Sequence, residues 1–164
     1  MQRTRIKICG LTRTEDVAAA VAAGADALGF VFYDKSPRFV TAAHAAQLIA
    51  TVPPFVTTVG LFVNATPQEV AAVTHISPVS QLQFHGDESP ELCAALASAA
   101  NRPFLRAFRV RPDTRPVELL ECENQYRAAS PLFSGLLLDT FVDAYGGAGK
   151  VFDWSLIPKE IAPR

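Results

Sequence analysis

Residues 4–32 read TRIKICGLTRTEDVAAAVAAGADALGFVF, and the pattern in this stretch indicates the fold class. Residues 4–9 alternate in polarity, which predicts a short strand ending at a cysteine. An alanine-rich run that begins at Thr14 and stops at Gly24 predicts a helix. Residues 27–32 then predict a second strand. A strand, a helix and another strand in this order predict a parallel sheet with helices outside it.

The same unit recurs along the rest of the chain. Helix starts are predicted at Thr41, at Thr66-Pro67 and at Ser89-Pro90, because these residues cap helices or occupy a first helical position. A weaker helix over 115–128 and a last one over 153–161 are also expected. The further strands are predicted at residues 55–63, 79–85, 104–110 and 133–139.

Two architectures have this rhythm, an open doubly wound sheet and a closed (β/α)₈ TIM barrel. Polar residues capable of chemistry lie at or just beyond the strand ends, and they are Cys9, Arg38, Asn64, His85 and Asp139. Because chemistry collects at the carboxyl ends of many strands in a barrel, the barrel explains this distribution better.

The chain length bears on how much of a barrel is expected. A complete eight-unit barrel typically needs about 200 to 250 residues, and this chain has 164 residues and six predicted units. We therefore expect residues 1–164 to form a single barrel domain that is C-terminally incomplete, with about six of the eight βα units.

Composition excludes several classes of protein. Hydrophobic residues make up 49% of the chain and charged residues 19%, which excludes disorder. A net charge of −1 gives no basic surface for nucleic acid, and no apolar stretch reaches the roughly 20 residues of a membrane span. Three scattered cysteines argue against a disulfide framework or a zinc site and are typical of a reducing compartment. A soluble cytoplasmic protein is expected.

Cys9 and Asp139 are the strongest candidates for chemistry. Cys9 ends a strand beside Gly10, where backbone can approach a ligand, and Lys7 shares its face. A buried structural thiol is the alternative. Asp139 ends the apolar run 136–138 and is either a general acid or a cap of the next loop.

Three further residues are candidates for ligand contact. Gln83 and His85 share one face of a predicted strand, which indicates either ligand contact or a structural hydrogen-bonded network. Arg38 follows Pro37 and has a planar donor fork suited to a carboxylate or phosphate, although a plain surface arginine is equally compatible.

The segment GGAGK at 146–150 invites a P-loop interpretation, which fails. Ala144 stands where the first glycine should be, and Val151 replaces the required Ser or Thr. A flexible loop over the site, or one that offers backbone N–H groups to an anion, is expected instead.

Seven segments together resemble the phosphoribosylanthranilate isomerase family in order and spacing. They are KICGLT (7–12), GADALGF (24–30), SPR (36–38), VGLFVN (59–64), QFHG (83–86), LDT (138–140) and GGAGKVFDW (146–154). The resemblance implies a (β/α)₈ barrel of tryptophan biosynthesis. It also implies an Amadori rearrangement of N-(5'-phosphoribosyl)anthranilate without cofactor or metal.

The resemblance also implies roles for individual residues. Asp139 corresponds to the general acid, Cys9 to the general base and Arg38 to the arginine that contacts the anthranilate carboxylate. The implied substrate-binding set is Arg38, Gln83, His85, Gly146 and Gly147. The expected partner is a small phosphosugar–anthranilate substrate, with a second copy of the chain or another tryptophan-pathway enzyme as the candidate protein partner.

The sequence also departs from the family pattern. Ala148 replaces a residue that is commonly Thr, and Phe84 replaces a frequent Leu. Family members continue through two more βα units, whose loops carry most of the phosphate site, so low or no activity is expected of this chain alone. An inactive assembly module and another sugar-phosphate barrel enzyme are the alternative functions.

Overall fold

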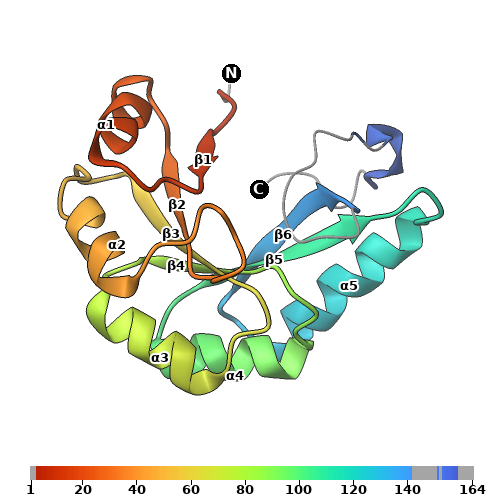
Figure 1. Cartoon of the computed structure of the whole chain (residues 1–164). Coiled ribbons are helices and arrows are strands. Elements are labelled where there is room, and N and C mark those ends of the chain that lie inside the picture. Colours follow the sequence, from red (N-terminus) through yellow and green to blue (C-terminus); the bar gives the residue numbers. More distant parts are fainter. Residues whose placement is uncertain (1–2, 142–150, 152, 159–164) are drawn as a thin grey trace.

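The computed structural model describes residues 3–141, 151 and 153–158. Its six strands are all parallel and lie in the order β1-β2-β3-β4-β5-β6 in one sheet. Figure 1 shows this sheet curled into an open arc, with the helices along its convex side and with β1 and β6 at its two ends. The elements in chain order are β1 (Lys7–Cys9), α1 (Thr14–Ala22), β2 (Ala27–Val31), α2 (Ala42–Ile49), β3 (Thr57–Phe62), α3 (Pro67–Ile76), β4 (Gln81–Phe84), α4 (Pro90–Ala100), β5 (Phe104–Val110), α5 (Pro116–Ala129), β6 (Phe133–Thr140) and the 3₁₀ turn η1 (Trp154–Leu156).

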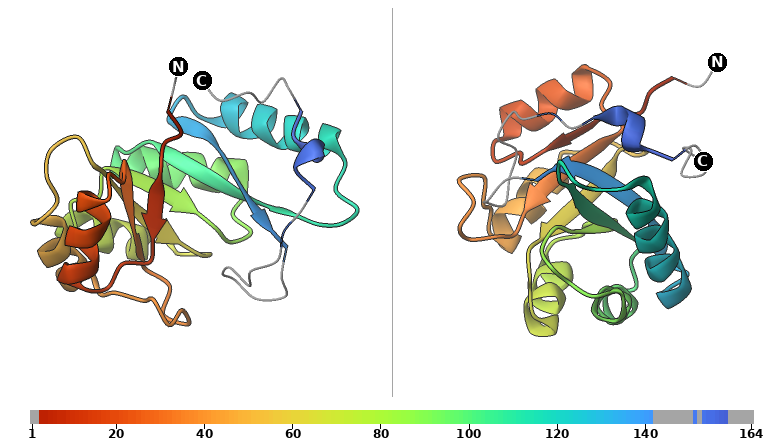
Figure 2. Two further views of the ribbon diagram at one scale, coloured as in Figure 1. Left: turned by 90° about the horizontal axis from the view of Figure 1, so that it is seen from above. Right: turned by 90° about the vertical axis from the view of Figure 1, so that its right-hand side faces the viewer.

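The strand order distinguishes the two predicted architectures. A doubly wound sheet reverses its strand order and carries helices on both faces. Here the order is strictly consecutive and the helices lie on one side of the curled sheet, as the two views of Figure 2 also show. The prediction of the barrel architecture is therefore confirmed, with six parallel strands forming a half-barrel.

Local sequence signals set the helix ends. Thr41 accepts a hydrogen bond from the His44 amide, and Thr66 and Glu69 form a reciprocal capping box. Ser89 accepts from the Leu92 amide at the start of α4. Gly24 ends α1 with φ +83, a conformation that residues with a Cβ rarely adopt.

The prediction of a last helix over 153–161 is wrong for residues 153–158, the part of it that the structure describes. Residues 153–158 form only the short turn η1, and Asp153 caps it by accepting from the Ser155 amide at 2.9 Å. Ile157 is extended, because a residue before a proline is pushed out of the helical region and Pro158 follows. Residues 159–161 of the prediction lie outside the described residues.

Three predicted strands begin later than expected. The first begins at Lys7 rather than at residue 4. Phe55 has φ +71, which an extended strand cannot accommodate, and β3 accordingly starts at Thr57. The fourth strand starts at Gln81 rather than at residue 79.

The core lies between the sheet and its helices. Leu82 and Phe84 of β4 are completely buried in it, together with aromatic neighbours such as Phe104 of β5. A second, smaller cluster of Val31, Leu61 and Val63 lies on the other face of the sheet. Alternation along β4 therefore directs Gln83 away from the main core and toward the concave side. None of the helices in the described part is long and apolar enough to cross a membrane.

Candidate active site

A cavity of about 190 Å³ lies at the carboxyl ends of the strands. Five residues of the predicted site line it, namely Cys9, Arg38, Gln83, His85 and Asp139. Lys7, which was expected on the same strand face as Cys9, lines it too. The sequence indicated no role in the site for the other lining residues, which are Tyr33, Ser36, Leu61, Val63 and Leu137. Gly146 and Gly147 lie outside the described residues. The structure thus brings together every predicted site residue that it describes.

Cys9 enters the cavity from the end of β1. Its side chain is half-buried and packs against the cluster of Val31, Leu61 and Val63. The chain then turns at Gly10, whose amide donates to the Gly29 carbonyl at 2.9 Å. The Cys9 side chain is thereby held against apolar side chains and still lines the cavity.

Arg38 lies over the same turn from the loop after β2. One of its guanidinium nitrogens donates to the Cys9 carbonyl at 3.4 Å. A Cβ at Gly10, where φ is +86, would lie 2.5 Å from Arg38 Cδ, so the arginine needs a glycine beneath it. This contact holds the guanidinium at the Cys9 backbone, in the cavity that Cys9 also lines.

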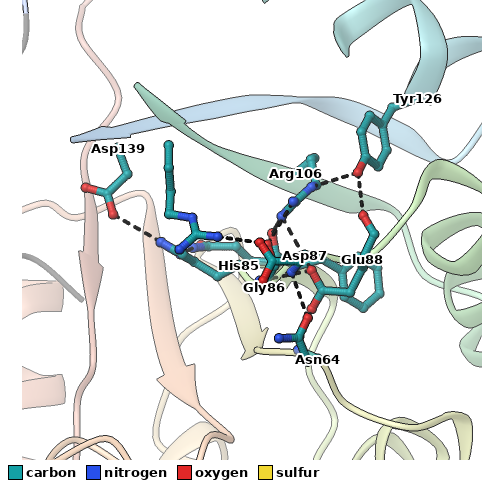
Figure 3. Close-up of polar contacts among 11 residues, drawn as sticks. Asn64, His85, Gly86, Asp87, Glu88, Arg106, Tyr126 and Asp139 are labelled. Carbon is teal, nitrogen blue, oxygen red and sulfur yellow. Dashed lines mark hydrogen bonds and ion pairs between the residues drawn. The ribbon is translucent and has the colours of Figure 1, made fainter. Parts of the chain in front are cut away.

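A chain of hydrogen bonds crosses the cavity from β1 to β6. Lys7 Nζ donates to Gln83 Oε1 at 2.9 Å, and Gln83 Nε2 lies 3.0 Å from His85 Nδ1. His85 Nε2 in turn lies 3.1 Å from Asp139 Oδ2, the contact shown in Figure 3. Gln83 and His85 therefore both line the cavity and belong to a hydrogen-bonded network, the two interpretations that the sequence left open.

His85 sits in an environment that favours its neutral form. Burial lowers the pKa of His85, and the cationic Arg106 and Arg109 lower it further. Asp139 opposes them, but the net direction is downward. Because an exposed histidine titrates near pH 6.5, His85 is neutral at pH 7.

A buried ion pair supports the loop that carries His85. The Glu88 side chain is almost wholly buried and lies 3.4 Å from Arg106, whose guanidinium also donates to the Phe84 and Gly86 carbonyls at 3.0 and 2.8 Å. Tyr126 accepts from Arg106 at 2.8 Å and donates to the Glu88 carbonyl at 2.6 Å (Figure 3). The carbonyls on both sides of His85 are thus fixed by one guanidinium. Sequence reasoning missed this network, although an arginine inside the apolar strand 104–110 was a signal for it.

Asn64 was expected among the chemically capable strand ends, and the structure gives it another role. Its amide N–H donates to Glu88 Oε1 and its side-chain oxygen accepts from the Asp87 amide, both at 2.7 Å. Asn64 adopts φ +51, which turns the chain there. It fixes the loop after β4 and does not line the cavity.

The other two cysteines belong to the packing. Cys93 of α4 is fully buried in the main core, and burial raises its pKa to about 12. Cys122 of α5 packs against the same core, and burial raises its pKa as well. Within the described residues, no group of three or more His, Cys, Asp or Glu side chains could hold a metal ion.

The sequence as a whole matches a known family. The family model described as N-(5'-phosphoribosyl)anthranilate (PRA) isomerase matches residues 6–163. The chain belongs to the N-(5'-phosphoribosyl)anthranilate isomerase family. The resemblance inferred from the seven segments is therefore confirmed.

Individual members of the isomerase family agree with this assignment. An N-(5'-phosphoribosyl)anthranilate isomerase of Herminiimonas arsenicoxydans is 65% identical over 164 residues, which is the whole of this chain and 72% of the relative's length. The phosphoribosylanthranilate isomerase of Thermotoga maritima superposes with a TM-score of 0.78 at 40% identity, over 94% of this chain and 70% of that one.

A second solved isomerase carries a ligand. It is a complex with reduced 1-(o-carboxyphenylamino)-1-deoxyribulose 5-phosphate, and it superposes with a TM-score of 0.71 at 37% identity. The alignment covers 85% of this chain and 66% of that one.

Proposed function

We propose that this chain converts N-(5'-phosphoribosyl)anthranilate to 1-(2-carboxyphenylamino)-1-deoxyribulose 5-phosphate, an Amadori rearrangement of tryptophan biosynthesis. The observation that carries the proposal is that Cys9 of β1 and Asp139 of β6 line one cavity from the two ends of the curled sheet. An aldose–ketose rearrangement needs one acid and one base on either side of a sugar, and it needs no net oxidation. The reduced ligand in the related isomerase supports this substrate class.

Asp139 is the proposed general acid. It gives a proton to the ring oxygen of the ribose while the bond between that oxygen and C1 breaks. The nitrogen lone pair of the anthranilate forms the new C1=N bond, so the open chain is a protonated Schiff base. A carboxyl group that is 27% exposed beside His85 is placed to deliver that proton and to take another from solvent between turnovers.

Cys9 is the proposed general base. Its thiolate takes the proton from C2, the C2–H electron pair forms a C1=C2 bond, and the C=N pair returns to nitrogen. The enolamine then gains a proton at C1 and loses the proton of the C2 hydroxyl, which gives the ketone. The thiol packs against the apolar cluster, of which Leu61 and Val63 also line the cavity.

The remaining site residues have binding roles in this proposal. Arg38 lies beside Cys9 and offers a planar fork to the anthranilate carboxylate. Gln83 and His85 form the wall between the base and the acid. Gly146 and Gly147 are proposed to contact substrate through backbone N–H groups, a role that follows from their sequence alone.

Because low activity is expected of residues 1–164 alone, the test measures turnover with the 164-residue chain in excess over substrate. Anthranilate fluorescence reports the loss of N-(5'-phosphoribosyl)anthranilate in a single turnover. We expect Cys9→Ala and Asp139→Asn each to slow this turnover by about 10²- to 10⁴-fold, the usual contribution of an acid or a base. Wild-type protein that neither binds nor converts this substrate would contradict the proposed function, and variants as fast as wild type would contradict the two roles.

A protein partner and a cellular compartment also belong to the proposal. A second copy of the chain, or another enzyme of the pathway, is the proposed protein partner, and sedimentation velocity at several concentrations tests the first of these. The cytoplasm is the proposed compartment, because three free cysteines suit a reducing environment.

A further inference from the structure

We propose that Lys7 and Gln83 are positioning residues that fix His85 as its Nε2–H tautomer, so that Asp139 transfers its proton through Oδ1 and not through Oδ2. The proposal rests on the function proposed above, because it assigns one oxygen of the general acid to the chemistry. It concerns residues that contact one another in a chain across the cavity.

The contact with Lys7 fixes the orientation of the Gln83 amide. A lysine ammonium has three donors and no acceptor, so the group 2.9 Å from Lys7 Nζ must be the amide oxygen of Gln83. Gln83 is 1% exposed, which leaves no water to replace a mispaired contact. The amide NH₂ group is therefore directed to the other side, toward His85.

The His85 tautomer follows from that orientation. Gln83 Nε2 lies 3.0 Å from His85 Nδ1, and an NH₂ group that donates there requires a ring nitrogen with a free lone pair. A neutral imidazole whose Nδ1 accepts carries its hydrogen on Nε2. Nε2 lies 3.1 Å from Asp139 Oδ2, so each contact then joins a donor to an acceptor.

The opposite tautomer fails at both ends of the chain of hydrogen bonds. With hydrogen on Nδ1, the Gln83 amide would have to turn its oxygen to His85 and its NH₂ group to Lys7. Two donors would then face each other at 2.9 Å. At the other end, the lone pair of Nε2 would face the Asp139 carboxylate at 3.1 Å, which is repulsive. Lys7 therefore decides the hydrogen position of a ring to which it is linked only through Gln83.

The Nε2–H group of His85 gives the two oxygens of Asp139 different roles. Oδ2 accepts from the Nε2–H group, and a proton on Oδ2 would point at that hydrogen. The protonated carboxyl group therefore carries its hydrogen on Oδ1, with Oδ2 as the accepting carbonyl oxygen. The ring of His85 thus holds the acid in one orientation and leaves one defined oxygen for the substrate.

Nuclear magnetic resonance of the 164-residue chain with ¹⁵N-labelled histidine tests this assignment, and His85→Gln identifies the signals. At pH 7 we expect a neutral ring with hydrogen on Nε2 and an acceptor-type Nδ1. In Lys7→Met the amide is free to turn, so both tautomers should appear. Lys7→Arg should restore the single tautomer, because a guanidinium also only donates. A wild-type Nδ1–H ring, or an unchanged single tautomer in Lys7→Met, would overturn the proposal.

Gln83→Glu provides an independent variant. The carboxylate that it introduces cannot donate, so the Nδ1 of His85 must carry a hydrogen, and the ring should become an imidazolium between the introduced carboxylate and Asp139. The groups facing His85 are then that carboxylate on β4, Asp139 of β6, and Arg106 and Arg109 of β5. We expect the titration midpoint of His85 to rise above its wild-type value. A midpoint that stays where it is or falls would overturn the assigned hydrogen positions.

Kinetics separate positioning from substrate contact. A positioning role predicts that Lys7→Met lowers kcat by about tenfold, leaves KM within about twofold, and is rescued by Lys7→Arg. A KM that rises while kcat is unchanged would overturn it, since that pattern belongs to a substrate ligand. The resonance measurement needs no turnover, so an error in the proposed function and an error in this inference give different results.

Discussion

Gly29 of β2 lies opposite Cys9 of β1 in the sheet, and a Cβ at position 29 would lie 2.8 Å from Cys9 Sγ. Such a Cβ would also lie 3.2 Å from Cys9 Cα, so more than a side-chain rotation is needed to make room. The missing side chain at position 29 is therefore what allows the thiol to sit at the end of β1 and face the cavity.

Gly29→Ala should destabilise the fold and displace the thiol. Overpacking of this kind costs about 1–3 kcal/mol, and we expect a loss in that range in the free energy of unfolding by urea. We also expect activity to fall because the base has moved. The same substitution in a Cys9→Ala background should cost less, since the sulfur at 2.8 Å is gone. An equal cost in both backgrounds would show that the thiol is not the obstruction.

Arg38→Lys should weaken substrate binding more than it affects the chemical step. A lysine keeps the charge and loses the planar fork, and hydrogen bonds to a charged group contribute about 1.5–3 kcal/mol. We therefore expect KM to rise by about 10- to 100-fold with little change in kcat, measured by the loss of anthranilate fluorescence.

A matched variant checks the Arg38 result from the backbone side. Gly10→Ala places a Cβ 2.5 Å from Arg38 Cδ and adds strain at φ +86. It should raise KM in the same direction as Arg38→Lys while leaving the guanidinium chemically intact. A Gly10→Ala variant with a wild-type KM would argue that the position of Arg38 does not matter for binding.

Alkylation should separate Cys9 from the other two thiols. Cys93 is fully buried with a pKa raised to about 12, and burial also raises the pKa of Cys122, so both have little thiolate at pH 8. Cys9 lines an open cavity, so iodoacetamide should modify it first, as measured by peptide mass spectrometry. All three should react in urea, which is the control. Equal labelling of the native thiols would contradict the packing described for Cys93 and Cys122.

The convergence of Cys9, His85 and Asp139 could be predicted from sequence for a simple reason. Parallel strands place all of their carboxyl ends at one edge, so a residue's position at a strand end is enough to locate it. The helix starts could also be predicted from the sequence, because the side chains of Thr41, Thr66 and Ser89 accept hydrogen bonds from amides only three residues away.

Pairings between distant residues could not be predicted in the same way. Lys7 and Gln83 are 76 residues apart, and only the curl of the sheet shows that the ammonium meets the amide. The partners of Glu88 depend likewise on β5 lying beside β4. The helix predicted over 153–161 fails in its described part for a local reason, because Pro158 keeps Ile157 out of the helical region.

The lowered pKa of His85 predicts how stability depends on pH. A histidine whose pKa is lower in the folded state binds fewer protons there than in the unfolded state. Its contribution is fully present above the unfolded pKa of about 6.5 and is lost as the pH falls toward the folded value. The free energy of unfolding should therefore decrease as the pH falls through about 6.5 and toward the lower pKa of the folded state.

His85→Gln is the control for that drop. Its amide can still donate to Asp139, but it does not titrate, so the decrease over the same pH range should be smaller than in wild type. His44 and His75 are exposed and common to both proteins, and their effects cancel in the comparison. An equally large decrease in His85→Gln would mean that another group causes the acid sensitivity.

Arg106→Met should be among the most destabilising single changes, because it leaves the Glu88 carboxylate buried without its cation. Glu88 has a side chain only 1% exposed, and breaking a buried pair by removing one partner costs about 3–5 kcal/mol. Arg115→Met provides the comparison. The Arg115 side chain is 72% exposed and pairs with Glu118, and exposed pairs contribute about 0–1 kcal/mol. Urea unfolding at pH 7 measures both. Adding Glu88→Gln to Arg106→Met should recover part of the loss, because the stranded charge is removed. The recovery is partial because the Asn64 and Gly86 amides each donate to a different Glu88 oxygen, and a glutamine keeps only one acceptor oxygen for them. If Arg106→Met and Arg115→Met cost the same, the buried pair does not hold the loop that carries His85.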